Sequence, residues 1–136
     1  MGTVYADITL RNANDIALSQ RGHIKAEDVR EVTVRSVVDT GAETLCINSD
    51  VFNKLGLGVE EQKTATVADG RKAACSVSSP VKIHWEDRTS VVRAIVLSES
   101  QEILLGAIPL EEMDLVVDPK NLKLIGAHGD KPLLRI

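Results

Sequence analysis

The sequence is poor in aromatic residues, which limits how its core can be built. One Tyr, one Phe and one Trp are present among 136 residues. The core must therefore consist of Val, Ile, Leu and Ala, and the abundance of β-branched Val and Ile favours strands. A hydrophobic fraction of 43% and a charged fraction of 26% are ordinary for a globular protein. We therefore expect a single, mostly-β domain over residues 1–136.

Cysteine and histidine are also scarce. Cys46 and Cys75 are too few and too far apart to form a disulfide framework, so we expect two reduced thiols in a cytoplasmic protein. The three His residues have no metal-ligand spacing with them, and we expect neither a metal nor another cofactor. A Cys-His nucleophile pair stays open as an alternative, although no local pattern favours it.

Basic clusters and long apolar runs are both missing. The formal net charge is -4, and Lys and Arg are scattered along the chain, which gives no electrostatic reason to expect a nucleic acid or an anionic membrane as a partner. No run approaches the roughly 18 apolar residues that span a bilayer. The first residues also lack the basic and apolar regions of a signal peptide. We expect no membrane partner.

What the sequence does contain is a series of short apolar runs between turn residues. The Asp69-Gly70 pair lies between two such runs and predicts a hairpin, and Glu86-Asp87 predicts a second turn. The predicted strands cover 4–10, 29–38, 44–47, 64–67, 72–77, 81–85, 89–97, 103–106, 115–117 and 122–125.

Two short helices are predicted between these strands. One covers 50–55, with Asn48 or Ser49 as its N-cap and Gly56 at its C-terminal end. The other begins near Pro109, a residue that suits the first turn of a helix. We read residues 12–15 as a turn, and residues 19–28 as a loop or a single helical turn.

The tetrapeptide Asp39-Thr40-Gly41-Ala42 is the segment most informative about function. Asp39 follows the apolar pair Val37-Val38, which holds its carboxyl group close to a hydrophobic core. Thr40 can fix the backbone by donating its hydroxyl to a facing main-chain carbonyl. Gly41 lets the backbone turn and lets a substrate strand approach, because it has no Cβ. Three such common residues also occur together by chance, so the surrounding sequence must support a functional reading.

That surrounding sequence is similar to the retroviral-type, or retropepsin-like, aspartic proteases, and in particular to their single-domain bacterial members. An apolar strand end leads into Asp39-Thr40-Gly41, a hairpin follows, and Leu104-Leu105-Gly106 precedes a short helix. The resemblance runs from about Val4 to Leu124. It implies a closed β-barrel, one half of an acid protease, with one or two short helices and active as a two-fold homodimer.

The resemblance also implies roles for individual residues. The catalytic group would be Asp39 with Thr40 and Gly41, the apolar-apolar-glycine element would pack behind their loop, and the hairpin would act as a flap. The substrate-binding positions that it implies are Ala42, Glu43, Ala68, Asp69 and Gly70. The predicted flap tip departs from the family pattern, because it carries one glycine and charged neighbours. Substrate preference is therefore not carried over.

These features lead to one preferred function and one alternative. Peptide hydrolysis by this route needs two carboxyl groups, yet the chain contains Asp-Thr-Gly only once. We therefore expect an aspartic endopeptidase in which a two-fold axis pairs two copies of Asp39 and a polypeptide substrate binds between the chains. The alternative is a catalytically silent, dimeric peptide-binding module with the same fold. The tail over 132–136 either pairs across the dimer or frays.

Overall fold

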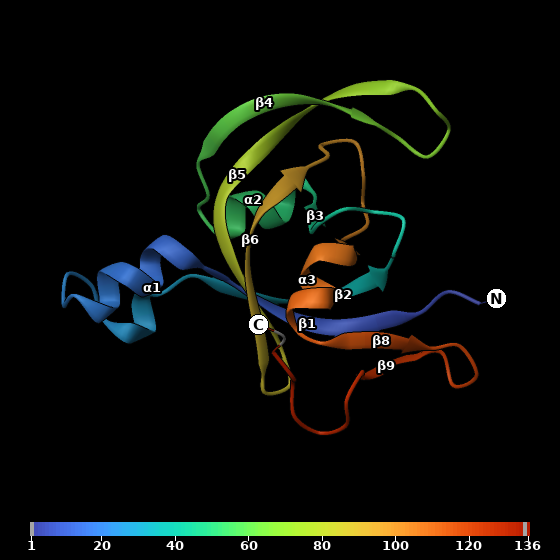
Figure 1. Cartoon of the computed structure of the whole chain (residues 1–136). Coiled ribbons are helices and arrows are strands. Elements are labelled where there is room, and N and C mark those ends of the chain that lie inside the picture. The colour runs from blue at the N-terminus through green and yellow to red at the C-terminus, as the bar shows by residue number, and fades with distance from the viewer. Residues whose placement is uncertain (1, 135) are drawn as a thin grey trace.

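The computed structural model describes residues 2–134 and 136, and its main feature is a seven-stranded sheet that closes on itself (Figure 1). The strand order is β1-β2-β7-β3-β6-β5-β4, and an additional pairing between β1 and β5 completes the ring. β8 and β9 form a separate two-stranded sheet. The predicted mostly-β closed barrel is confirmed. The described residues contain three short α-helices, where one or two were expected.

Short connections join the helices and strands along the described chain. In order they are β1 (Tyr5–Asn12), α1 (Ala13–Gln20), the 3₁₀ turn η1 (Ala26–Asp28), β2 (Glu31–Val38), β3 (Cys46–Ile47), α2 (Ser49–Lys54), β4 (Val59–Thr66), β5 (Lys72–Trp85), β6 (Arg88–Val96), β7 (Leu104–Leu105), α3 (Ala107–Glu112), β8 (Leu115–Asp118) and β9 (Lys123–Gly126).

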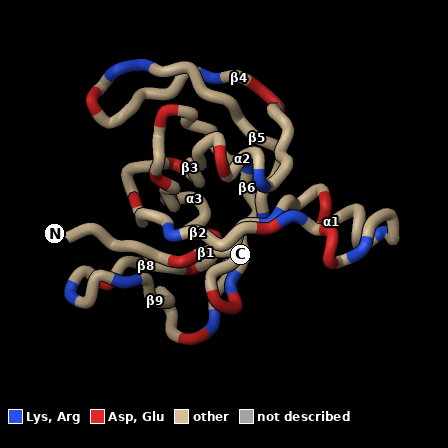
Figure 2. The backbone as a smooth tube through the Cα atoms, turned by 180° about the vertical axis from the view of Figure 1, so that it is seen from behind, with Lys and Arg blue, Asp and Glu red and all other residues tan. Residues whose placement is uncertain are grey.

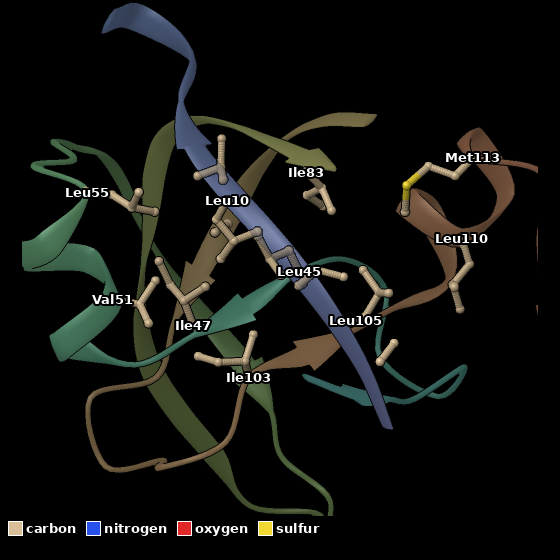
Figure 3. Close-up of a cluster of buried hydrophobic side chains, with 14 of the residues drawn as sticks. Leu10, Leu45, Ile47, Val51, Leu55, Ile83, Ile103, Leu105, Leu110 and Met113 are labelled. Atoms are coloured by element: carbon tan, nitrogen blue, oxygen red, sulfur yellow. The ribbon is translucent and has the colours of Figure 1, made fainter. Parts of the chain in front are cut away.

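The core is aliphatic, as the lack of aromatic residues predicts. Alternate residues of β1 point inward, and Ile8 and Leu10 are almost completely buried. Side chains from the strands and from α2 and α3 fill the barrel around them (Figure 3). The labelled members of this cluster are Leu10, Leu45, Ile47, Val51, Leu55, Ile83, Ile103, Leu105, Leu110 and Met113.

The segment after β1 is a helix, so the predicted turn over residues 12–15 is wrong. Asn12 caps α1, since its side-chain oxygen accepts a hydrogen bond from the Asp15 N–H at 3.0 Å. Asn is favoured both in turns and at helix N-caps, and only the structure distinguishes the two roles here. The predicted single turn within 19–28 is present as η1. Figure 1 shows α1 projecting sideways from the barrel.

An ion pair between a buried Asp15 and a half-exposed Arg30 anchors this projecting segment. Both carboxylate oxygens of Asp15 accept hydrogen bonds from the Arg30 guanidinium, at 2.8 and 2.9 Å, and one also accepts from the Arg30 N–H at 3.1 Å. Replacing Asp15 with Ala is expected to lower the free energy of unfolding by about 2 kcal/mol, as measured by urea denaturation. The control is Asp50→Ala, which removes an exposed pair with Lys54 and should cost only about 0.5 kcal/mol. Equal losses in the two variants would contradict this assignment.

The contribution of Asp15 depends on pH in a defined direction. Hydrogen bonds from the Arg30 side chain lower the pKa of Asp15 below its ordinary 3.8, although burial opposes this. A lowered pKa means that the folded state favours the charged form, so the stabilisation is complete well above pH 3.8 and is lost as the pH falls through the lowered pKa. The difference between the wild type and Asp15→Ala should shrink correspondingly in acid.

β5 is one strand of 14 residues, whereas the sequence predicts two strands over 72–77 and 81–85. The chain passes through Pro80 at a shift of register against β6, between Val77 and Pro80. A bulge tolerates proline because the missing N–H is not needed there. The Ser78 hydroxyl accepts a hydrogen bond from the Ala94 N–H at 3.0 Å. Ser79 also bonds to the Gly58 N–H, at 3.1 Å, so buried polar groups at the bulge are satisfied.

The predicted hairpin around Asp69-Gly70 is confirmed as the connection between β4 and β5. Gly70 has a φ of +87°, which a glycine adopts without strain, and its N–H bonds to the Val67 carbonyl at 2.9 Å. β4 begins at Val59, earlier than predicted, because backbone pairing with β5 holds a strand whose side chains are almost all exposed.

The predicted α2 is also confirmed: Asn48 caps it and Gly56 follows it with a φ of +62°.

The C-terminal tail adds no strand in its described residues. Leu133 and Leu134 are exposed, and the Leu133 N–H bonds to the Asp114 carboxylate at 3.0 Å. Arg135 lies outside the described residues. Pairing of the tail across a dimer stays a prediction.

Candidate active site

The backbone of Asp39 is fixed by β7. β2 runs parallel to β7, with Val37 opposite Leu104 and Val38 opposite Leu105. The pairing continues past the end of β2, since the Asp39 N–H donates to the Leu105 carbonyl at 3.0 Å. Asp39 therefore begins a loop, but its main chain is held by the central part of the barrel.

The side chain of Asp39 is oriented from within its own loop. It is half-buried, and its Oδ1 atom accepts a hydrogen bond from the Gly41 N–H at 2.9 Å. A Cβ on Gly41 would lie 3.2 Å from that oxygen, so a larger residue would press on the carboxylate. Within the described residues, Oδ2 of Asp39 has no hydrogen-bond partner. One oxygen is thus held in place, and the other can contact water or substrate.

Gly106 packs directly behind this loop. A Cβ at Gly106 would lie 2.4 Å from the Thr44 carbonyl oxygen and 2.6 Å from that of Ala42. No other residue leaves room for this approach. The Ala107 N–H then bonds to the Ala42 carbonyl at 2.8 Å, and the Ile108 N–H bonds to that of Glu43 at 2.8 Å. The expected packing of the apolar-apolar-glycine element against the loop is present.

The residues expected to bind substrate lie in two places. Ala42 and Glu43 belong to the Asp39 loop, where Ala42 is half-buried and Glu43 is exposed. Ala68, Asp69 and Gly70 form the exposed tip of the β4–β5 hairpin. In Figure 1 this hairpin arches over the same side of the barrel as the loop between β2 and β3. No hydrogen bond or ion pair joins the tip to the loop in the described residues.

The hairpin tip carries its own ion pair. The Asp69 carboxylate accepts hydrogen bonds from the Arg71 N–H at 3.0 Å and from its guanidinium at 2.6 Å. These bonds, that of the N–H foremost, lower the pKa of Asp69. The tip is therefore polar and charged, as its sequence indicates.

Thr40 is exposed beside Asp39, and its hydroxyl has no acceptor in the described part of this chain. The described residues of the same chain therefore do not supply the main-chain carbonyl that was expected to accept a hydrogen bond from the Thr40 hydroxyl.

Sequence analysis missed one residue near the site, Cys46. Cys46 lies opposite Leu104 in an antiparallel pairing, and it is half-buried. Burial raises the pKa of its thiol to about 11, and the nearby charge of Asp39 contributes. The thiol therefore stays protonated at neutral pH and forms an apolar wall near the carboxylate. Alternation in β3 could have revealed this, since Leu45 and Ile47 face the core.

Two further findings concern metals and membranes. Among the described residues, no three His, Cys, Asp or Glu side chains are grouped closely enough to hold a metal ion. In the same part of the chain, every helix falls short of the length and apolar character that a membrane span requires.

Comparison with known proteins found a matching family model and similar solved structures. Residues 24–112 match the family model described as gag-polyprotein putative aspartyl protease. No curated protein matches the chain significantly. The retroviral protease-like domain of Ddi1 from Leishmania major has a similar structure, with a TM-score of 0.58 and 16% sequence identity over 99% of this chain and 96% of that one. A retropepsin-like aspartic protease from Rickettsia conorii matches with a TM-score of 0.44 and 18% identity over 87% of this chain and 89% of that one.

The family match covers well over half of the chain and includes the whole Asp39 loop and α3. The Leishmania domain shares the fold along almost the full length of both chains. The chain therefore has the retropepsin fold and belongs to the retropepsin-like aspartic protease family.

Proposed function

We propose that this protein is an aspartic endopeptidase whose active unit is a two-fold homodimer of the domain over residues 1–136. The observation that carries the proposal is the placement of Asp39. Its backbone is bonded to β7, one carboxylate oxygen is held by the Gly41 N–H, and the other oxygen is open. A carboxylate held in this way is suited to activate water.

The need for a second carboxyl group supports the dimer. In the aspartic proteases two carboxyl groups share one proton, so that one is charged while the other is neutral. The sequence supplies Asp-Thr-Gly once per chain, and a two-fold axis beside Asp39 would supply the second copy. The exposed Thr40 hydroxyl would then donate to a main-chain carbonyl of the partner.

The proposed reaction uses the two copies of Asp39 in different protonation states. The charged carboxylate removes a proton from a water molecule, whose oxygen attacks the scissile carbonyl carbon. The neutral carboxyl group gives its proton to the carbonyl oxygen, which forms a tetrahedral diol. Collapse of the diol breaks the C–N bond: the proton taken from water passes to the leaving amine, and one diol hydroxyl returns its proton to the carboxylate that had protonated the carbonyl oxygen. The products are a carboxylic acid and an amine, and the carboxyl pair is again singly protonated.

We propose that the β4–β5 hairpin serves as a flap over an extended substrate, with Ala68, Asp69 and Gly70 above it and Ala42 and Glu43 below. The tip offers exposed main-chain groups, which can pair with a peptide as a strand does.

Free thiols at Cys46 and Cys75 are typical of reducing compartments and support a cytoplasmic location.

Assembly in solution tests the shared site. Sedimentation at micromolar concentration should give twice the 14.7 kDa chain mass. Thr40→Val, which removes the hydroxyl but keeps the shape of the side chain, should weaken the dimer by roughly 30-fold in dissociation constant, because a two-fold dimer would lose two hydrogen bonds of about 1 kcal/mol each. Thr40→Ser keeps the hydroxyl and is the control. A wild-type protein that is strictly monomeric and still cleaves peptides would refute the proposal. A stable dimer without activity would favour the silent peptide-binding module.

A further inference from the structure

The surface beside Asp39 is a narrow apolar strip. Leu104 pairs with Val37 in parallel and with Cys46 in antiparallel register, so the three side chains lie on the same face of the sheet. All three are half-buried. Their neighbours Leu105 and Ile47 point to the opposite face and are completely buried in the core. The apolar strip formed by Val37, Cys46 and Leu104 therefore faces away from the core.

Asp39 lies on the same face as the apolar strip. It comes two residues after Val37 in a chain that stays bonded to β7, and alternate residues of an extended chain share a face. The effect of the Asp39 charge on Cys46 is an independent sign that these two side chains are near each other. A substrate side chain next to the scissile bond would thus rest on the apolar strip.

Glu102 lies at the end of this strip. It comes two residues before Leu104, just before β7 begins, and the intervening Ile103 points into the core, so the side chains of Glu102 and Leu104 lie on the same, outward face. The backbone there is held in place: the Val37 N–H bonds to the Ile103 carbonyl at 2.7 Å, and the Asn48 side chain bonds to the Gln101 carbonyl at 3.2 Å. Glu102 is exposed, and no cationic side chain of the described residues lies within ion-pair distance of it. Figure 2 shows acidic segments on the loop between β6 and β7, below the hairpin.

The basic residues of the hairpin do not neutralise Glu102. Arg71 is already paired with Asp69. Lys72 comes three residues before Cys75, so their side chains lie on opposite faces of β5. Cys75 lies on the inner face, since its thiol is buried and contributes to the raised pKa of Cys46. Lys72 therefore points outward, and the carboxylate of Glu102 is left without a partner until a substrate binds.

We propose that Glu102 selects peptides that carry Lys or Arg close to the apolar residue at the scissile bond. This inference rests on the proposed peptidase function and names its substrate class. An ion pair at a partly exposed site discriminates by roughly fivefold in rate or affinity, and cover by the hairpin would increase this by excluding water. An acidic side chain at the same position would be rejected, because two carboxylates would face each other.

Digestion of a synthetic peptide library with randomised sequences tests the inference. The true cleavage sites are those that the wild type cuts and Asp39→Asn does not. The absence of such sites would refute the peptidase function itself. Given such sites, we expect one position within a few residues of the cut to be enriched in Lys and Arg. Cleavage sites without this enrichment would overturn the role of Glu102 and leave the peptidase function standing.

Matched peptides with Lys, Gln or Glu at the enriched position then assign the preference to one residue. The ratio of kcat/KM for the Lys and Gln peptides should be about five or more in the wild type and should fall toward one in Glu102→Gln. The control Glu27→Gln changes an exposed glutamate of η1, far along the chain from the loop, and should keep the wild-type ratio. An unchanged ratio in Glu102→Gln, or an equal fall in the control, would overturn the inference.

Discussion

Replacing Asp39 with Asn is expected to reduce kcat/KM for peptide hydrolysis by about 10²–10⁴-fold or to background, because an amide cannot take a proton from water. The substitution should leave the fold unchanged. Asn has the same shape as Asp, and its oxygen can still accept the hydrogen bond from the Gly41 N–H that Oδ1 accepts now. Thermal unfolding should therefore be nearly the same for the two proteins. Full activity in Asp39→Asn would remove Asp39 from the reaction.

Mixed dimers test whether both copies of Asp39 are needed. When equal amounts of wild type and Asp39→Asn exchange subunits freely, about one quarter of the dimers contain two intact copies. Activity per wild-type chain should then fall to about half of its unmixed value, because only dimers with two aspartates react. If each carboxylate acted alone, activity per wild-type chain would not change on mixing. The two mechanisms therefore give distinct results at full subunit exchange.

The second large effect is expected at Gly106. A methyl group there would lie 2.4 Å from the Thr44 carbonyl oxygen, and this neighbour is backbone that cannot rotate away. Gly106→Ala should therefore push the Asp39 loop off α3 and lower the free energy of unfolding by about 3 kcal/mol. Peptide cleavage should be lost even where the protein remains folded, since the loop would no longer hold Asp39 against β7.

Gly58→Ala is the matched control for Gly106. A Cβ on Gly58 would meet no atom within 4 Å, and its backbone does not have the positive φ that favours glycine. This variant should keep wild-type stability to within about 0.5 kcal/mol. Both variants add the same methyl group, so the difference between their free energies of unfolding in urea measures the clash of that group with the backbone at position 106. A Gly106→Ala protein as stable and active as Gly58→Ala would show that the loop does not depend on close packing.

Local sequence signals predicted most of the features that depend on neighbouring residues. Asp69-Gly70 was enough to predict the hairpin, because its turn needs a positive φ at one glycine. The N-cap of α2 was predicted as Asn48 or Ser49 and is Asn48, and Gly56 marked the other end of the helix. The relation between the Asp39 loop and Gly106 was predicted through family resemblance, since it depends on a contact across more than sixty residues that no local pattern contains.

The features that sequence analysis missed depend on tertiary partners. Asn12 was read as a turn residue, whereas in the structure it caps α1, and Asp15 in the first turn of that helix pairs with Arg30. β4 has almost no apolar alternation, so its length comes from pairing with β5 and not from its own side chains. Cys46 was predicted only to be a reduced thiol, because its neighbour Leu104 lies on a paired strand that is far away in the sequence.

The unbroken course of β5 determines where the hairpin can bend. Residues 81–84 of this strand are bonded to β1 on one side and to β6 on the other, so that end is clamped in the barrel wall. The other end pairs with β4 alone near the tip, from Lys72 to about Cys75. The hairpin is therefore fixed to the barrel at one end and free at the other. Because Ser76 and Val77 still pair with β6 beyond the bulge at Pro80, the part of the hairpin that can bend begins near Cys75.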